Sequence, residues 1–432
     1  MNFVKPSSWL FFVVFALISL SASTVFAHSG YVSGRLMFYN NQGHYCPNTR
    51  NCTGAKYVAA DFNKYLPVSH ARVYVYQTGT ESVIGQGISD FNGNFKLRWD
   101  SPDHSSPIYI RWNPTHKDNR FAIRGSSGGQ WNFNTHTFYA ELPTTITSPQ
   151  QIGTRYWGSS SAPNPLTNLY NGAWRMWHYA LSSSARMNAH FNDLEIRAFD
   201  SNCGNPSGGA CAIGSLNRVN IMNSFSAYGL NTILHEMGHI ASYRASHNQN
   251  YKFSSDYNWP NTGDGGDWEF NKPEWGAAQF EEGLATFYGA RAIYWQNAIE
   301  PYTCSNSLAS PCPDNLFNIA DYSGPYIGPS SCIPYESRFP ITVVRYLRRL
   351  YDNNGDINQP FYEFFDTIND FPGGIGNGDK DEPFCDGYWP WDPDYLCDRD
   401  GRSTRDFRRH FEARTGTDTT TDWYLNCSPV GD

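Results

Sequence analysis

The five residues His235 to His239, HEMGH, constrain the fold more than any other stretch of the chain. Residues four apart project from one face of a helix, so His235 and His239 could bind one zinc ion through their imidazoles. We expect Asn231 to be the N-cap of this helix. Its apolar stripe is predicted at helical spacing, at Ile233, Leu234, Met237, Ile240 and Ala241.

Glu236 follows the first of these histidines directly. Zinc lowers the pKa of a water that it holds toward about 7, and a nearby carboxylate can then accept the proton as the water attacks a carbonyl. We therefore expect Glu236 to be a general base, and later an acid, rather than a metal ligand.

The third ligand has to come from elsewhere in the chain. The metzincin pattern would place Gly at 242 and His at 245, but the sequence has Ser242 and Ala245. His247 lies eight residues past His239, which is roughly 80° around the helix and two turns away, so it is poorly placed for the same ion. We interpret His247 as a histidine at the end of the helix or on the surface.

A second helix is predicted in NKPEWGAAQFEEGLATFYGARAIYW, from Asn271 to Trp295, with Asn271 as its cap. Its segment EEGLATFYG resembles the second zinc helix of gluzincin metallopeptidases. That resemblance implies Glu282 as the third ligand, and Glu281 is the competing choice. Gly283 costs about 1 kcal/mol inside a helix compared with alanine, which suggests that another element approaches closely there.

A tyrosine is a candidate for stabilising the oxyanion. IPYESRFPITVVRYLRRL resembles a segment of the aminopeptidase branch of gluzincins, in which a tyrosine before a helix contacts the oxyanion, and this implies that role for Tyr335. Phe339 and Pro340 depart from that pattern, and a loop tyrosine that only packs is the alternative. No segment matches the amine-binding motif of that branch, so we expect an endopeptidase.

Export is predicted from the N-terminus. Lys5 precedes the apolar run WLFFVVFALISL, and small residues follow, which is typical of a signal peptide cleaved after Ala27. This run is too short for a bilayer core that needs about twenty residues, so we expect a secreted, extracellular or periplasmic protein without stable membrane insertion. The ten cysteines agree with an oxidising compartment. Close pairs suggest local disulfides, whose connectivity the sequence leaves open: Cys46/Cys52, Cys203/Cys211, Cys304/Cys312 and Cys385/Cys397.

The N-terminal part reads as short strands, which suggests a β-sandwich. In GQGISDFNGNFKLRW, Asn92-Gly93 predicts a hairpin with a type I′ turn. Over residues of about 31 to 112 the order of strands and turns resembles transthyretin-like, carboxypeptidase regulatory-like domains. That resemblance implies an accessory module, one that positions the protein or binds an extracellular polymer.

We therefore expect a multidomain chain: a signal peptide (1–27), an N-terminal all-β sandwich (28–145) and an α+β zincin-like metallopeptidase domain (146–432). The net charge of −8 argues against a nucleic-acid partner. We interpret the arginine clusters RYLRRL (345–350) and RDFRRH (405–410) as solvated helix faces.

The predicted function is hydrolysis of protein or peptide substrates with one catalytic zinc ion. His235, His239 and Glu282 would hold the zinc, Glu236 would move the proton, and Tyr335 would contact the oxyanion. The acidic segments NGDKDEPFCDG (377–387) and CDRDGRS (397–403) leave a structural Ca²⁺ site open, although neither has EF-hand spacing. Two alternatives remain: a non-catalytic adhesion or glycan-binding protein on a zincin scaffold, and a zinc amidase that acts on a cell-wall polymer.

Overall fold

The chain of 432 residues is described by a computed structural model over part of its length. The described residues are 28–41, 63–101, 107–128, 141–142, 150–162, 164–203, 209–222, 229–248, 276–294, 296, 302–304, 316–318, 340–351, 358–370 and 404–419. The predicted signal peptide (1–27), Tyr335 and both acidic segments lie outside them. Within the described residues, no helix is both long enough and apolar enough to cross a membrane.

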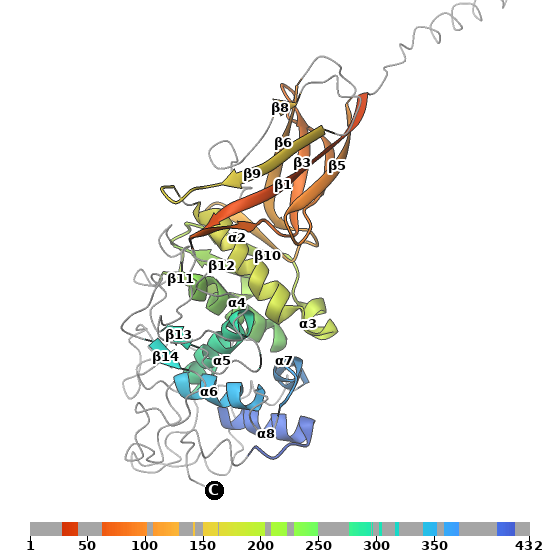
Figure 1. The fold of residues 1–432 in the computed structure, drawn as a ribbon. Helices are drawn as coiled ribbons and strands as arrows, with labels where there is room; N and C mark the ends of the chain where they lie inside the picture. The colour runs from red at the N-terminus through yellow and green to blue at the C-terminus, as the bar shows by residue number, and fades with distance from the viewer. Residues whose placement is uncertain are drawn as a thin grey trace, which may run out of the picture.

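Two sheets face each other in the β-rich N-terminal region (Figure 1). In the first sheet, β1 pairs with all three of its neighbours: β1 (His28–Asn40), β2 (Lys64–Pro67), β5 (Asn94–Ser101) and β9 (Gln150–Trp157). The facing strands are β3 (Ala71–Gln77), β4 (Ser82–Ile88) and β6 (Ile108–His116). Alternate side chains of both sheets are buried in one core, as in the β3 pattern with Val73 and Val75 inside.

The second sheet continues beyond this region. Its order is β11-β12-β10-β7-β6-β3-β4, and β8 (Glu141–Leu142) also pairs with β6. The added strands are β7 (Phe121–Gly125), β10 (Leu194–Ala198), β11 (Ala210–Ile213) and β12 (Arg218–Ile221). β7, β10 and β12 are parallel, whereas β11 forms an antiparallel edge. β6 and β7 join through the single pair Thr115 and Ala122.

The strands do not separate at the predicted boundary near residue 145. β7 lies before that point in the chain but pairs with β10, and β9 lies after it but pairs with β1. The chain is thus a mixed α/β protein with a β-rich N-terminal region, and one buried cluster runs from Val32 to Phe411. The division into 28–145 and 146–432 stays a prediction.

The predicted Asn92-Gly93 hairpin is wrong, although both of its strands exist. β4 belongs to the sheet of β3, whereas β5 pairs with β1, so the connection passes from one sheet to the other. Only Gly93 has a positive φ, of 79°. The backbone N–H of Gly93 donates to the backbone oxygen of Asp90, and the Asp90 carboxylate accepts hydrogen bonds from the backbone N–H groups of Asn92 and Asn94, so the turn is not of type I′.

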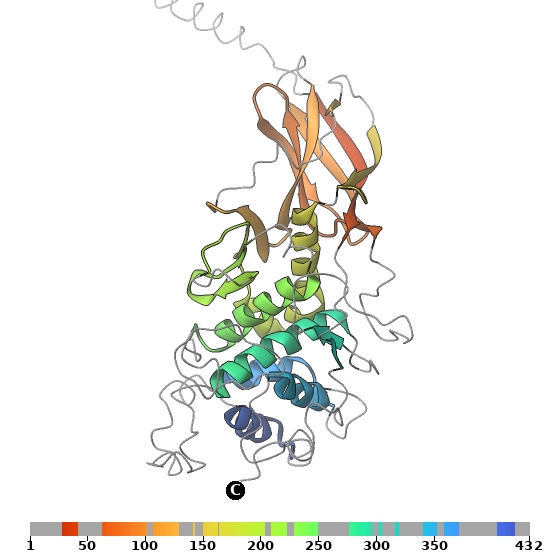
Figure 2. The ribbon, with the colours of Figure 1, turned by 90° about the vertical axis from the view of Figure 1, so that its left-hand side faces the viewer.

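Helices cover one face of the second sheet and continue away from it (Figure 2). Those nearest the sheet are α2 (Pro165–Met176), extended by a π-helical turn (Trp177–Leu181), and α4 (Leu230–Ala245). Beyond them lie α5 (Gly276–Ile293) and α6 (Pro340–Tyr351). Shorter elements complete the described part: α3 (Ala185–His190), a 3-10 turn (Gly214–Leu216), β13 (Tyr302–Cys304), β14 (Leu316–Asn318), α7 (Tyr362–Asp370) and α8 (Thr404–Thr415).

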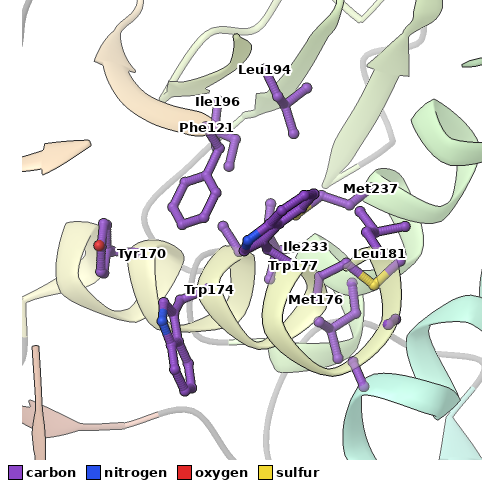
Figure 3. Packing of buried hydrophobic residues seen from close by; sticks show 14 of the residues in the cluster. Phe121, Tyr170, Trp174, Met176, Trp177, Leu181, Leu194, Ile196, Ile233 and Met237 are labelled. Atoms are coloured by element: carbon purple, nitrogen blue, oxygen red, sulfur yellow. The ribbon is translucent and has the colours of Figure 1, made fainter. Parts of the chain in front are cut away.

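The core between the sheet and these helices fixes the position of α4. Phe121, Leu194 and Ile196 point from β7 and β10 toward Ile233 and Met237 of α4 (Figure 3). All five side chains are buried, and each stabilises the fold by about 1.5 to 3 kcal/mol relative to its exposed state. The helix that carries HEMGH is thereby packed against a rigid sheet.

Two further sequence predictions have different outcomes. Cys203 and Cys211 form a disulfide, which confirms that pair. In each of the other three predicted pairs, at least one cysteine lies outside the described residues. The interpretation of RYLRRL as a solvated face is wrong, because Arg345 and Arg348 of α6 are 3% and 2% exposed. Arg348 is held there by donating to the backbone oxygen of Gln296, at 2.7 Å.

Three histidines lie where the β-rich region meets α2. His70 accepts a hydrogen bond at Nδ1 from Trp174 Nε1, at 3.1 Å, and its ring is 6.1 Å from His116 and 6.3 Å from His178. Burial lowers the pKa of all three, and the positive charge of Lys117 contributes in each case. The effect is largest for His116, whose pKa falls from 6.5 to about 3 through burial and then through His70 and Lys117.

This junction predicts that the fold loses stability in acid. Folded His116 stays neutral down to a pH of about 3, whereas the unfolded chain binds its proton near pH 6.5. The free energy of unfolding should therefore be highest above pH 6.5 and fall toward pH 3, with a contribution of up to about 1.4 kcal/mol per pH unit. Urea titrations between pH 4 and 7 should give a flatter acid limb for His116→Gln than for the wild type. Equal slopes would contradict the assignment.

Candidate metal centre

Three side-chain atoms from two helices converge at one point. His235 Nε2 lies 2.9 Å from Glu282 Oε2, His239 Nε2 lies 3.1 Å from the same oxygen, and the two nitrogens are 3.0 Å apart. The imidazoles come from α4 and the carboxylate from α5. Among the described residues, these are the group of His, Cys, Asp and Glu side chains whose ligand atoms could hold a metal ion.

The donor set fits a bound cation. Ligand atoms that are about 2.0–2.2 Å from one tetrahedral zinc ion lie about 3.3 Å from one another, close to the separations seen here. Lone pairs on three atoms at this spacing repel one another unless a bound cation or a shared proton lies among them. The Glu282 side chain is only 2% exposed, and a bound cation would offset part of the hydration that its carboxylate has lost. Two imidazoles and one carboxylate are the ligands that zinc and other divalent transition metals prefer.

The approach of α4 to α5 depends on Gly238, inside the HEMGH segment. A Cβ at Gly238 would lie 2.4 Å from the backbone oxygen of Ala285 in α5. One turn earlier, Leu234 of α4 faces Gly289 of α5, where an added Cβ would be 3.2 Å from Leu234 Cβ. Residue numbers rise along one helix as they fall along the other, so the two helices are antiparallel and meet backbone to backbone.

Gly283 has the close neighbour that the sequence predicted. A Cβ there would lie 2.5 Å from Val343 Cβ and 2.8 Å from the backbone oxygen of Pro340, both in α6. α5 is therefore held between α4 on one side and α6 on the other, at the turn of helix that carries Glu282. Small residues on both faces are what allow this carboxylate to reach the two histidines.

Thr286 is a site residue that the sequence analysis missed. Its Oγ1 lies 3.0 Å from Nδ1 of His235, on the side of the ring opposite the converging Nε2. A partner at Nδ1 fixes the ring orientation and, by accepting the Nδ1 proton, leaves Nε2 with a free lone pair. Because Thr286 follows Glu282 by four residues on the predicted helix, helical spacing would have placed both on one face.

The two adjacent glutamates have different surroundings. Glu282 faces the histidines, whereas Glu281 is 6% exposed and its Oε2 accepts a hydrogen bond from Ser242 Oγ at 2.5 Å. The structure therefore groups Glu282 with the histidines, and Glu281 instead ties α5 to α4. Ser242, where a metzincin would have glycine, is the residue of α4 that makes this link.

Glu236 is partly exposed on α4 beside His235. Within the described part of the chain its carboxylate has no hydrogen-bond or ion-pair partner, so it is free to bind a water. The His235 and His239 side chains are 14% and 12% exposed, which leaves the group accessible from one side. Glu236 therefore lies next in the chain to a group that could hold a metal ion and that is partly accessible to solvent.

The remaining sequence predictions around the site differ in outcome. His247 does not join the metal group: it follows α4, is exposed, and its Nε2 lies 2.8 Å from the backbone oxygen of Asn369. Asn231 is not the N-cap, because α4 begins at Leu230 with Gly229 as the cap. Tyr335, Asn271 and the segments considered for Ca²⁺ lie outside the described residues.

Comparisons with known proteins add little to this geometry. No protein-family model matches the chain, and no curated protein matches it. Among solved structures, a 9R-lipoxygenase from Cyanothece PCC8801 is 14% identical over 38% of this chain and 24% of its own, with a TM-score of 0.18. The chain thus spans about a quarter of the length of that protein, and the similarity is too low to indicate a shared fold.

The close contact between α4 and α5 predicts unequal losses of stability for two glycine replacements. Gly238→Ala forces a methyl group against the Ala285 backbone, which should cost about 1 to 3 kcal/mol, lower the melting temperature and reduce bound zinc. Gly289→Ala is the milder comparison: its nearest neighbour is Leu234 Cβ at 3.2 Å, a tight contact that a shift of a few tenths of an ångström relieves, and alanine favours a helix by up to about 1 kcal/mol, so the loss of stability should be much smaller than at Gly238. Calorimetry and elemental analysis would measure both effects. Equal behaviour of the two variants would contradict the close crossing at Gly238.

The role of Thr286 predicts a change in metal affinity. Thr286→Val keeps the shape of the side chain but removes the hydroxyl at His235 Nδ1, so zinc affinity should fall about 10- to 100-fold. Thr286→Ser, which keeps a hydroxyl, should restore most of the affinity. Competition with a chelating dye would measure both. If Val and Ser variants bound zinc equally, the hydroxyl would have no part in orienting the ring.

Proposed function

We propose that this chain is a secreted zinc-dependent peptidase of the gluzincin type, with endopeptidase specificity. The observation that carries the proposal is the convergence of His235 Nε2, His239 Nε2 and Glu282 Oε2 within 3.1 Å, with Glu236 beside them on the same helix. The mixed sheet with its antiparallel edge strand β11, covered by α4, supports a zincin-like α+β fold for this part. The disulfide Cys203–Cys211 supports export.

His235, His239 and Glu282 would hold the zinc ion. Bound there, zinc would polarise a carbonyl group and lower the pKa of water toward about 7. The fixed rings of the two histidines, one of them held by Thr286, would keep the site open on the side where their edges are exposed.

Glu236 would move the proton of the reaction. Its carboxylate would accept a proton from the attacking water and then donate it to the nitrogen of the leaving amine as the C–N bond breaks. A partly exposed position, with no other hydrogen-bond partner among the described residues, suits this role because the carboxylate can turn between the two atoms. Tyr335 would contact the oxyanion, as its sequence register implies.

Substitutions at the two carboxylates and one histidine would test this proposal. Glu236→Gln should keep its zinc but lose turnover by about 100-fold or more, because the amide cannot accept a proton. His239→Ala should lose the zinc. Glu281→Gln should retain the metal, since the Glu281 carboxylate contacts Ser242 and not the histidines.

Two measurements would decide the outcome: elemental analysis of purified protein, and cleavage of a mixed protein panel with and without chelator. Turnover by Glu236→Gln at the wild-type rate would reject the mechanism. One bound zinc with no cleavage of any protein would favour a binding protein on a zincin scaffold. Release of an amide from a cell-wall polymer, without proteolysis, would favour the amidase.

A further inference from the structure

The outer face of the first sheet has a composition unlike that of an ordinary solvated sheet. β1 lies between β9 on one edge and both β5 and β2 on the other (Figure 1). Its even-numbered residues, such as Val32 and Leu36, enter the core. Its odd-numbered residues therefore point outward, together with the cross-strand partners that share their face.

Tyrosines are concentrated on this outer face. Tyr31, Tyr65 and Tyr156 are 44%, 40% and 57% exposed, and they are three of the four exposed tyrosines among the described residues; the fourth is Tyr362. A tyrosine on an open sheet face gives up favourable burial, so three on one face need a reason.

Two of these tyrosines are held rigid by ring contacts. Tyr39, which is 9% exposed, packs edge to face against Tyr65 with ring centroids 5.3 Å apart. Tyr65 packs in the same manner against Tyr156, at 4.6 Å. A preformed cluster of this kind loses little side-chain entropy when it binds a ligand.

Positive charges lie between the tyrosines. The outward residues Arg35 of β1 and Lys96 and Arg98 of β5 are basic, and Lys96 Nζ lies 5.3 Å from the Tyr31 ring. Asp100 is the acidic residue at the outward positions of these four strands, and its pair with Arg98 is more than half exposed, so it is weak. The face is therefore positive although the whole chain carries a net charge of −8.

Two tyrosines of the opposite sheet are paired with an arginine of their own sheet. Tyr76 and Tyr109 stack on β3 and β6, and the Arg111 guanidinium lies 4.7 Å and 5.1 Å from their ring centres. Glu81 in turn accepts a hydrogen bond from Tyr109. Tyr65 and Tyr156 have ring contacts too, and the Tyr65 hydroxyl donates to the backbone oxygen of Gly158 at 3.4 Å, but the two tyrosines remain 40% and 57% exposed.

We propose that the outer face of β2, β1, β5 and β9 binds a linear anionic polysaccharide. Exposed tyrosine rings stack on the C–H faces of sugar rings while their hydroxyls contact sugar hydroxyls. Arg35, Lys96 and Arg98 complement the carboxylates of uronic acid units. Tyr156 pairs with Met37, which lies six residues after Tyr31 along β1. At about 3.3 Å per residue the face from Tyr31 to Tyr156 is roughly 20 Å long, enough for several sugars in a row.

The composition favours a polysaccharide over an apolar protein partner. Polar residues separate the aromatic rings: Ser33 and Arg35 of β1 pair with Lys96 and Asn94 on one side, and Arg35 pairs with Thr154 on the other. The core of a protein interface is instead apolar and depleted of charge. The binding face is also separate from the metal group, so the proposal stands whether or not the chain is a peptidase.

Affinity electrophoresis of the whole mature protein would test this binding. Gels would contain polygalacturonate, a neutral β-glucan or poly-L-glutamate. Polygalacturonate should retard the wild type, and the double variant Tyr65→Ala/Tyr156→Ala should bind about tenfold more weakly or worse. Lys96→Ala/Arg98→Ala should bind more weakly and with less dependence on salt.

Tyr362→Ala is the matched control and should bind like the wild type; Glu236→Gln should as well. Equal melting temperatures would show that each variant is folded.

Three results would overturn the proposal. The first is absence of retardation by polygalacturonate. The second is retardation by poly-L-glutamate that equals that by polygalacturonate and survives the tyrosine replacements, which would indicate an unspecific polyanion or acidic-peptide surface. The third is equal binding of the neutral glucan, which would leave the basic residues without a role.

Discussion

The close contact of α4 with α5 is the interaction on which the candidate metal centre depends. Gly238 lets the two backbones meet at Ala285, and Gly283 lets α6 press α5 from the other side. At this separation the short carboxylate of Glu282 reaches two imidazoles one turn apart on α4. A methyl group at Gly238 would push α5 away and move the Glu282 carboxylate further from the histidines than the geometry of a metal site tolerates.

The sheet gives this contact a fixed position. Side chains of β7 and β10 pack on Ile233 and Met237. The sheet thus fixes one face of α4, while its two histidines face α5. The same sheet continues through β6 into the β-rich region, where the proposed polysaccharide face lies on the other, separate sheet. Binding of a polymer and hydrolysis would thus use different surfaces of a molecule that shares one buried core.

Local sequence patterns predicted which segments form helices and strands better than they predicted how those segments pair and pack. The apolar stripe around HEMGH forms helix α4, and most of the second predicted helix, NKPEWGAAQFEEGLATFYGARAIYW, forms α5. Asn92-Gly93 marked a real turn, but backbone and side-chain hydrogen bonds of Asp90 close it, and the strands that it connects belong to different sheets. Arg345 and Arg348 were expected in solvent and are buried. Arg348 donates to the backbone oxygen of Gln296, which lies 52 residues earlier in the chain, and its guanidinium lies over the Tyr351 ring of its own helix.

The sequence by itself determined the chemistry of the candidate site: two histidines four apart, a glutamate between them, and a glutamate-glycine pair on a second helix. The histidine pair follows from helical spacing and from the ligands that zinc prefers, whereas the glutamate-glycine pair was implied by the resemblance to gluzincins. Only the tertiary structure decided which glutamate joins the histidines, that Thr286 orients His235, and that Ser242 binds Glu281. The physical reason is that helix rotation about its own axis is set by packing against neighbours, and spacing within one helix carries no information about that rotation.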